Sequence, residues 1–495
     1  MRGRSGHIAA TLAVSLCAAA GPCRQNFEAR AAEFLALSGA PTRFIPADRV
    51  SQSYRASFAR RLGQAALGAP RADERGAGDS DSLVGEMFAA AHGYFQGCQG
   101  ANGRLWEAEV VLDGYVSTLV GNGSSVRSAA KDEIMWRSDL ADRTGITSAH
   151  RVRGSLCAPR FCEREEVEEL VLPHFLAQRL GLRGRGGFAA MSEGGKVEIA
   201  ELAHWSELKM DFVVAGVNHC GTTSIRRNLN LHPEIAFTGN AFWEDAFFEY
   251  VMQHRLLPLR QQVEDFNKRR AGAGARIVGV SDSTMYLNAM TRYALALMPQ
   301  VQAVVVVCDP VGRLEKHVLQ QHLCQGNSDL PHLTLPPAEA ATASASRGDC
   351  LPSLAAALEV PGLIQSQVVS HHLWSLLNLL QSRLLLLHQD LLREMPRRFF
   401  DSLAHLLGAG PFSTRLRFHR FNSHRGHRTD LCLNASLVKV LKRRLRWEYE
   451  SLEKLLSASG MPPPASLRLR LTRCDRPEEL DAGAESCGNH TRCGH

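Results

Sequence analysis

Residues 210–235 of this 495-residue chain read MDFVVAGVNHCGTTSIRRNLNLHPEI. An apolar segment over 212–215 runs into a turn that opens at Gly216 and closes at Gly221, and an amphipathic segment follows. In a strand–turn–helix of this kind, the backbone N–H groups of the turn and of the helix N-terminus point at an anion. The stretch therefore predicts a phosphate-binding loop between a buried strand and a helix.

The spacing of this loop is that of a P-loop with one position changed. Four residues separate Gly216 from Gly221, and Thr222 stands where a nucleotide hydrolase carries its lysine, with Thr223 after it. Phosphoryl transfer in those enzymes also needs a residue that holds Mg²⁺, and no clear one is evident. The pattern therefore argues against a nucleotide kinase or hydrolase and favours another phosphate-bearing ligand.

The chain around this loop alternates strand and helix patterns. Strands are predicted over 211–215, 276–281, 303–308 and 383–387. Helices are predicted over 222–231, 311–323, 363–380 and 396–407, with one long helix over 436–456. Because runs such as VVVV and LLLL are typical of strands buried on both faces, the fold class is α/β with a doubly wound parallel sheet. Ligands of such sheets bind beyond the carboxyl ends of the strands.

Length and ordinary composition allow two or three globular domains. The predicted division is a cysteine-containing, mainly helical region of unknown role over 23–182, a Gly-rich linker over 183–208, the α/β domain over 209–457 and a cysteine-rich tail over 458–495. The net charge of +7 is modest, and no nucleic-acid partner is expected. Its densest basic stretches, 415–428 and 442–446, are either solvated faces or anion-binding surfaces. The oligomeric state is not predicted.

The N-terminus has the composition of a targeting segment. Arg2 and Arg4 precede an apolar run over 8–20, which is short for a membrane span and ends in small residues suited to cleavage. A cleaved secretory signal over 1–22 is predicted, with an uncleaved signal-anchor as the alternative that would attach the chain to a membrane. Glycosylation sequons at Asn122, Asn434 and Asn489 agree with a secretory route.

The chain has 13 cysteines, a number that predicts disulfides in a secreted protein. Setting aside one in the signal, Cys220 in the loop and Cys308 at a strand end, ten remain to form up to five bridges. Candidate pairs are Cys157 with Cys162 and Cys324 with Cys350. Because the spacings do not repeat as paired C-x2-C knuckles, no metal site is expected.

The loop is similar to the phosphosulfate-binding loop of sulfotransferases, which use 3′-phosphoadenylyl sulfate (PAPS). Further segments resemble, in order, the later motifs of Golgi glycan and heparan-sulfate-type members: WEDAFF at 243–248, the strand and turn at 303–313 that hold the 3′-phosphate, the late strand at 384–392 and a basic segment at 425–428 that closes over the cofactor. A looser match lies at 278–286. The resemblance covers about half the chain and marks it as a divergent member.

The resemblance implies transfer of a sulfuryl group from PAPS to a hydroxyl or amine of a glycan or glycoprotein, including an anionic polysaccharide, in the Golgi lumen or after secretion. Such catalysis is mostly positioning and charge neutralisation. The resemblance makes Glu244 the base that takes the acceptor's proton, with a solvated carboxylate as the alternative, and makes His219 the replacement for the loop lysine. The implied cofactor-binding residues are Cys220, Gly221, Thr222, Thr223, Ser224, Arg313, Lys316, Arg425 and Gly426.

Three positions depart from the family pattern. His219 replaces a lysine, Cys308 an arginine and Lys316 a serine. Lys316 and Arg313, one helical turn apart, either restore the charge that Cys308 removes or form an ordinary basic helix face. A second hypothesis therefore stays open: a non-catalytic member that binds nucleotide or anionic glycan without turnover. The acceptor and its sulfated position are not predicted.

Overall fold

The computed structural model describes residues 21–40, 42–43, 79–112, 150–180, 196–238, 255–320, 364–419 and 434–475. The chain divides into two compact units. The first contains residues up to Lys209 together with Glu249–Lys268 and Ala289–Met298, and the second contains Met210–Phe248, Arg269–Asn288 and Pro299–His495. The predicted α/β domain is therefore interrupted by two segments that belong to the first unit.

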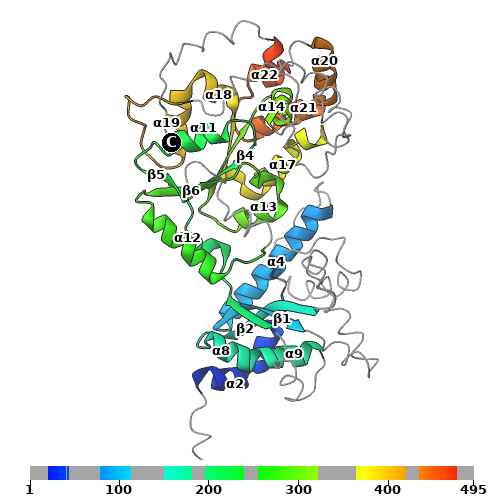
Figure 1. The fold of residues 1–495 in the computed structure, drawn as a ribbon, viewed down its shortest axis with the longest axis vertical. Coiled ribbons are helices and arrows are strands. Elements are labelled where there is room, and N and C mark those ends of the chain that lie inside the picture. The colour runs from blue at the N-terminus through cyan, green and yellow to red at the C-terminus, as the bar shows by residue number, and fades with distance from the viewer. Residues whose placement is uncertain are drawn as a thin grey trace, which may run out of the picture. The chain divides into compact units, whose positions relative to one another are not determined.

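The first unit is mainly helical around a three-stranded antiparallel sheet (Figure 1). The strands, in the order β2-β1-β3, are β2 (His150–Pro159), β1 (Gly103–Leu112) and β3 (Lys196–Glu201). The helices are α2 (Pro22–Ala36), α4 (Asp79–Gly100), α8 (Arg164–Glu166), the π-helix η2 (Val167–Val171), α9 (Leu172–Leu180), the 3-10 turn η3 (Trp205–Glu207), α13 (Ala289–Ala296) and most of α12 (Arg260–Gly272).

Part of the predicted linker is ordered structure. The prediction is wrong for β3 and η3, because β3 pairs with β1 from Trp106↔Glu201 to Val111↔Lys196. The sequence KVEIAE has the alternation of apolar and polar residues that suits a strand, and the Gly-rich stretch before it hides this short signal. The linker residues 183–195 lie outside the described residues.

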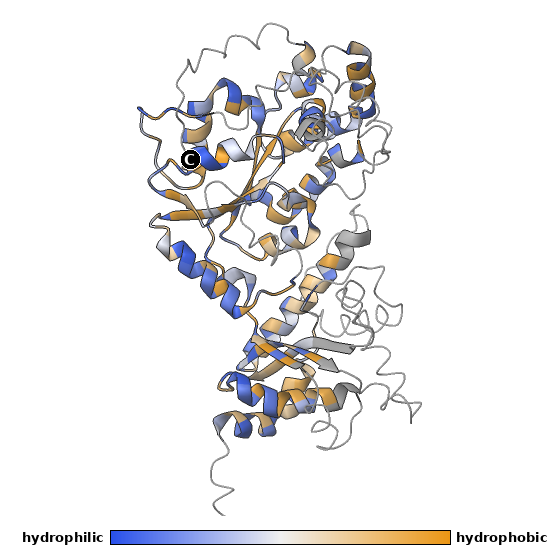
Figure 2. Ribbon diagram, viewed as in Figure 1, coloured by the Kyte–Doolittle hydropathy of each residue, from blue (hydrophilic) through white to orange (hydrophobic). Residues whose placement is uncertain are grey.

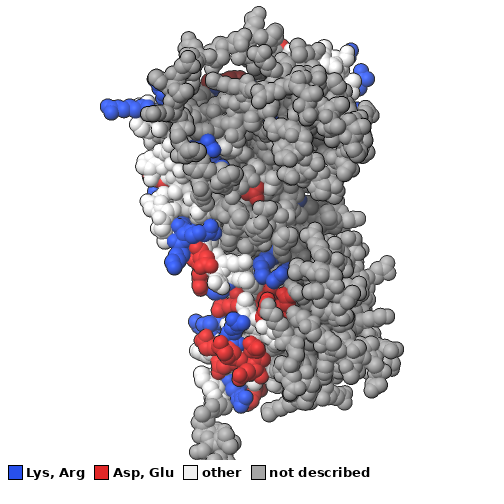
Figure 3. All heavy atoms as spheres, viewed as in Figure 1, with Lys and Arg blue, Asp and Glu red and all other residues white. Residues whose placement is uncertain are grey.

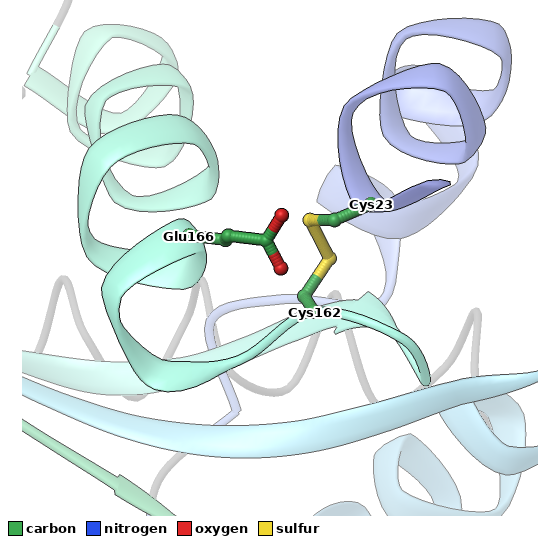
Figure 4. A group of neighbouring side chains, drawn as sticks. All are labelled: Cys23, Cys162 and Glu166. Atoms are coloured by element: carbon green, nitrogen blue, oxygen red, sulfur yellow. A yellow bond between two sulfur atoms is a disulfide. The ribbon is translucent and has the colours of Figure 1, made fainter. Parts of the chain in front are cut away.

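Two disulfides hold the first unit together, and they correct the predicted pairing of Cys157 with Cys162. Cys157 bonds to Cys98 at the end of α4, and Cys162 bonds to Cys23 at the start of α2 (Figure 4). Because β2 stays extended through Pro159, Cys157 is held within the sheet while Cys162 lies beyond the following turn. The carboxyl group of Glu166 lies beside the second bridge, but its two sulfurs are bonded to each other and offer no thiolate for a metal.

The second unit is built on a five-stranded parallel sheet in the order β5-β6-β4-β7-β8. Its strands are β4 (Phe212–Gly216), β5 (Ile235–Phe237), β6 (Ile277–Ser281), β7 (Gln302–Val307) and β8 (Leu384–His388). The apolar strands lie inside the unit, as the orange ribbons of Figure 2 show, and β4 and β6 are buried along their whole length. The α/β fold with a parallel sheet and a mainly helical, disulfide-linked N-terminal region is therefore confirmed.

Helices flank this sheet close to the predicted positions. They are α11 (Thr222–Leu229), α14 (Pro310–Gln320), α17 (Ser370–Leu380), α18 (Gln389–Glu394), α19 (Pro396–Leu406), α20 (Ala435–Arg444), α21 (Arg446–Ala458) and α22 (Ala465–Arg468), with 3-10 turns at Met285–Leu287, Gln365–Gln367, Gln381–Arg383 and Arg473–Asp475. The single helix predicted over 436–456 is two helices, because Leu445 leaves the helical conformation (φ −95°, ψ 9°). Among the described helices, none is both long and apolar enough to cross a membrane.

Candidate phosphosulfate site

One loop lies at the point in the sheet where the order of strand addition reverses. From β4 the chain adds β5 and β6 on one side, and it then adds β7 and β8 on the other side. Ligands of parallel α/β sheets bind beyond the carboxyl ends of the strands at this reversal. The residues there are 217–221, which connect β4 to α11, so the loop predicted to bind phosphate lies at the expected place.

The backbone of this loop forms a compact turn. The N–H of Val217 donates to the carbonyl of Val306 at 2.9 Å, and the N–H of Cys220 donates to the carbonyl of Val217 at 3.1 Å. His219 and Gly221 have left-handed backbone angles, with φ of 65° and 106°. Residues of this conformation bring successive N–H groups to one side of a turn. The Cys220 amide is therefore used inside the loop itself.

The start of α11 continues this surface. Gly221 is the residue before the helix, and the first N–H groups of a helix point out of its N-terminus. The side chains of Thr222 and Ser224 are buried, whereas His219, Gly221 and Thr223 are partly exposed. The predicted loop residues therefore lie together, and the half-exposed ones are accessible to a ligand.

Lys316 brings a cation to this loop from the neighbouring helix. Its ammonium group donates a hydrogen bond to the carbonyl oxygen of His219 at 3.1 Å. The side chain comes from the second turn of α14, the helix that follows β7. The sequence predicts Lys316 as a cofactor ligand on the 3′-phosphate side, and the structure places its ammonium at the loop between β4 and α11.

Arg313, one turn before Lys316, has a different environment. The residue is 3% exposed, and its guanidinium donates to the side-chain oxygen of Gln367 at 3.1 Å and to the backbone carbonyl of the same residue. Burial lowers the pKa of Arg313, and the nearby Tyr286 and Glu448 oppose this effect. The side chain therefore connects α14 to the segment before α17. Cofactor binding by Arg313 stays a prediction, and it requires this contact to open.

Two buried carboxylates cap the helices beside the loop, and neither was predicted from the sequence. Glu448 on α21 accepts hydrogen bonds from the Val369 N–H at 3.0 Å and from the Ser370 hydroxyl at 2.6 Å at the start of α17. Asp309 accepts from the Gly312 N–H at 2.9 Å at the start of α14, and the hydroxyl of Tyr449 also donates to it. Burial raises the pKa of each carboxyl. The Asp-Pro pair at 309–310 is a helix-start signal that would have revealed the second cap.

Tyr286 supports the loop from the other side. Its hydroxyl donates to the side-chain oxygen of Asn218 at 3.1 Å, and its ring leaves no space for a side chain at Gly216, where a Cβ would lie 2.3 Å from a ring carbon. Burial raises the pKa of Tyr286 to about 12, so the phenol is a neutral donor at pH 7. In the sequence, Tyr286 stands out only as the last residue of the looser match at 278–286.

Cys220 and Cys308 form a disulfide, which corrects the interpretation that both stand apart from the bridges. Because β4 and β7 are adjacent parallel strands, the residues that follow their carboxyl ends lie close together, and the two Cα atoms are 5.3 Å apart. The Cys308 sulfur, at the position where the resemblance to sulfotransferases predicts an arginine, is therefore bonded to the loop between β4 and α11. Recognising the pair required the strand order.

The remaining predicted site residues are not placed. Glu244, the predicted base, and Arg425 and Gly426, in the predicted closing segment, lie outside the described residues, as do Cys324 and Cys350. These assignments stay predictions. The described part of the candidate site is therefore the loop between β4 and α11 with the residues that support it, without the groups expected to face the acceptor.

Comparisons with known proteins show a likeness to solved structures. No protein-family model matches the chain, and no curated protein matches it. A crystal structure of a sulfotransferase from Alicyclobacillus acidocaldarius is similar, with a TM-score of 0.35 and 15% identity, over 52% of this chain and 99% of that one. The likeness concerns the fold, and a TM-score of this size carries no conclusion about activity.

Proposed function

We propose that this protein transfers a sulfuryl group from PAPS to a hydroxyl or amine of a glycan or glycoprotein. The observation that supports this most is the Lys316 ammonium at the carbonyl of His219, beside a P-loop-like turn that has no lysine at Thr222. A cation supplied by the next helix suits a bound phosphosulfate, because charge builds on the leaving phosphate during transfer. The loop motif and the ordered later motifs select PAPS over other phosphate ligands.

The described residues fit the phosphosulfate end of this donor. The groups that would contact the phosphosulfate are the backbone amides at the start of α11, the partly exposed Thr223 and the Lys316 ammonium. His219 adds an imidazole that can donate a hydrogen bond or, when protonated, a charge. PAPS, when bound, supplies the activated sulfuryl group, and the protein's part is to hold it and neutralise its charge.

The acceptor side is proposed from the sequence motifs. Glu244 would take the proton of the attacking hydroxyl or amine, and Arg425 with Gly426 would close over the donor. Three described disulfides are consistent with an extracellular or lumenal protein, and the secretory signal and glycosylation belong to the same proposal. Figure 3 shows acidic side chains over α8 and η2 in the first unit, so an anionic acceptor is expected to avoid that face.

A second function is favoured by two specific contacts. Cys308 replaces an arginine and is tied in a disulfide, and the Arg313 guanidinium is tied to Gln367. Neither supplies a charge to a 3′-phosphate in this arrangement. A protein that binds nucleotide or anionic glycan at the same fold without turnover is the alternative.

Calorimetry with 3′-phosphoadenosine 5′-phosphate, the product left after transfer, tests the proposed site. Binding in the micromolar range or tighter, together with weak or no binding of Mg·ATP, is expected. The transferase and a non-catalytic nucleotide-binding protein both need this binding, and sulfate transfer separates these two functions. A folded, oxidised protein that ignores this nucleotide contradicts the site, and one that prefers Mg·ATP supports a nucleotide kinase or hydrolase instead.

A further inference from the structure

We infer that the Cys220–Cys308 disulfide positions the phosphate loop, so that nucleotide binding depends on the redox state of this bridge. The inference rests on the proposed function, because it concerns how the same loop binds its ligand. Both half-cystines are buried, with Cys220 0% and Cys308 5% exposed. The bridge is therefore a part of the interior below the loop and not a surface link.

The disulfide connects the two chain segments that follow β4 and β7, beyond the last backbone hydrogen bond between them. The last backbone bond between the two chain segments runs from the Val217 N–H to the Val306 carbonyl. Beyond it, the first segment turns into the loop and the second segment turns into α14. The disulfide joins the two segments where they diverge, so it holds the loop at the carboxyl ends of β4 and β7.

The segment that contains Cys308 and α14 contacts the loop at two consecutive residues, His219 and Cys220. Cys308 directly precedes Asp309, which caps α14, and Lys316 of that helix returns to the carbonyl of His219. His219 in turn directly precedes Cys220. One attachment is a covalent bond and the other a hydrogen bond to a charged group. The disulfide thus fixes the Lys316 ammonium relative to the amides that face the anion.

Reduction would remove this constraint without removing the fold. A dithiol reductant gives two electrons and two protons, the S–S bond breaks to two thiols, and the reductant becomes a disulfide. Four buried apolar residues line a small pocket beside the bridge, namely Val217, Val307, Val369 and Leu452, and their burial does not require the S–S bond. The loop must then be ordered when the ligand binds, and this ordering lowers affinity. We expect a loss of about ten-fold.

The test compares binding of 3′-phosphoadenosine 5′-phosphate by the full chain in three forms: oxidised wild type, Cys220→Ala/Cys308→Ala, and Cys98→Ala/Cys157→Ala as a control bridge in the first unit. The loop variant is expected to bind about ten-fold more weakly at unchanged helicity by circular dichroism, and the control variant to bind like wild type. Equal binding by a folded loop variant would overturn the inference and leave the proposed function intact. Absence of binding by the oxidised wild type would overturn both.

A second measurement covers the case in which a variant does not fold. Wild-type protein is equilibrated in glutathione buffers of graded redox ratio, and alkylation with peptide mass spectrometry gives the fraction of the Cys220–Cys308 bridge. Affinity should fall with that fraction and return on reoxidation at constant helicity. A bridge that only stabilises the fold would not move affinity in this reversible way, and affinity independent of the fraction contradicts the inference.

Discussion

The ammonium of Lys316 donates a hydrogen bond to the carbonyl oxygen of His219 across 3.1 Å, which joins α14 to the turn between β4 and α11. The loop lacks the lysine that a P-loop carries in its own sequence, and His219 replaces the lysine of the sulfotransferase pattern. The Lys316 ammonium, from the neighbouring helix α14, lies at this loop. The charge of the site is therefore supplied through the tertiary fold.

Replacement of this cation should weaken nucleotide binding. Lys316→Met keeps most of the side-chain volume and removes the charge, and hydrogen bonds to charged groups contribute about 1.5–3 kcal/mol, equivalent to about 10- to 150-fold in affinity. Calorimetry with 3′-phosphoadenosine 5′-phosphate measures the loss. Lys439→Met, at an exposed position of α20, is the matched control and should bind like wild type. Equal affinity of both variants would remove Lys316 from the site.

Gly216 should not tolerate a side chain. Its φ of 148° suits glycine, and a Cβ would lie 2.3 Å from a ring carbon of Tyr286 and 3.2 Å from the Ser283 carbonyl. Gly216→Ala is expected to lower the free energy of unfolding by about 2–3 kcal/mol. Gly272→Ala in α12, where nothing lies within 4 Å, should instead be neutral or stabilise by about 0.5–1 kcal/mol. Denaturant titration compares the two, and similar effects would contradict the packing described.

The hydroxyl of Tyr286 should contribute to the stability of the protein separately from its ring. Tyr286→Phe keeps the ring against Gly216 and removes the hydrogen bond to Asn218, which should cost about 1 kcal/mol of stability. Because Asn218 lies in the loop, faster amide hydrogen exchange is expected over residues 217–221 in this variant. Exchange as slow as in wild type would show that the hydroxyl does not hold the loop.

A histidine pair makes the first unit sensitive to acid. Nδ1 of His204 accepts from the Ser206 N–H at 3.1 Å, and Nε2 lies 2.5 Å from Nδ1 of His92, so the neutral ring donates its single proton to His92. Burial, followed by repulsion from His92, lowers the pKa of His204 to about 4, and Glu207 opposes this effect. Burial also lowers the pKa of His92.

The sign of the pH effect follows from these shifts. The folded pKa of His204 lies below the ordinary value of 6.5, so the unfolded state binds more protons between pH 6.5 and about 4. The stabilisation is complete above pH 6.5 and is lost as the pH falls toward 4. Hydrogen exchange of β3 should therefore speed up more between pH 7.5 and 4.5, after correction for intrinsic rates, in wild type than in His204→Asn, since asparagine can still cap η3. Equal acceleration would exclude the pair as the cause.

The parallel sheet could be predicted from sequence because its strands carry their own signal. The runs FVVA, VVVV and LLLL are apolar throughout, and Gly216 and Gly221 mark the turn that follows the first of them. β5 has three residues, too few for any periodicity, and the break at Leu445 leaves the apolar pattern of the surrounding helices unchanged. Local patterns therefore located the loop and most of the helices around it.

Contacts between distant segments could not be predicted in the same way. The Cys220–Cys308 bridge depends on β4 and β7 being neighbours, and a sequence pattern does not give strand order. Spacing left open whether Arg313 and Lys316 together replace the charge that Cys308 removes or form an ordinary basic helix face. In the structure, Gln367 from another segment binds the guanidinium, and the ammonium lies at the loop. In each case the tertiary fold determines which residue lies beside which.

Acceptor-dependent transfer of labelled sulfate from PAPS tests the central claim most directly. The purified, oxidised full chain is assayed against a panel of neutral and anionic glycans, with Glu244→Ala and His219→Ala as controls. Labelled glycan and an equal amount of 3′-phosphoadenosine 5′-phosphate are predicted, with at least a 100-fold loss in Glu244→Ala, about the contribution of a general base. Tight nucleotide binding without labelled product across the panel would contradict the enzyme and favour the binding protein.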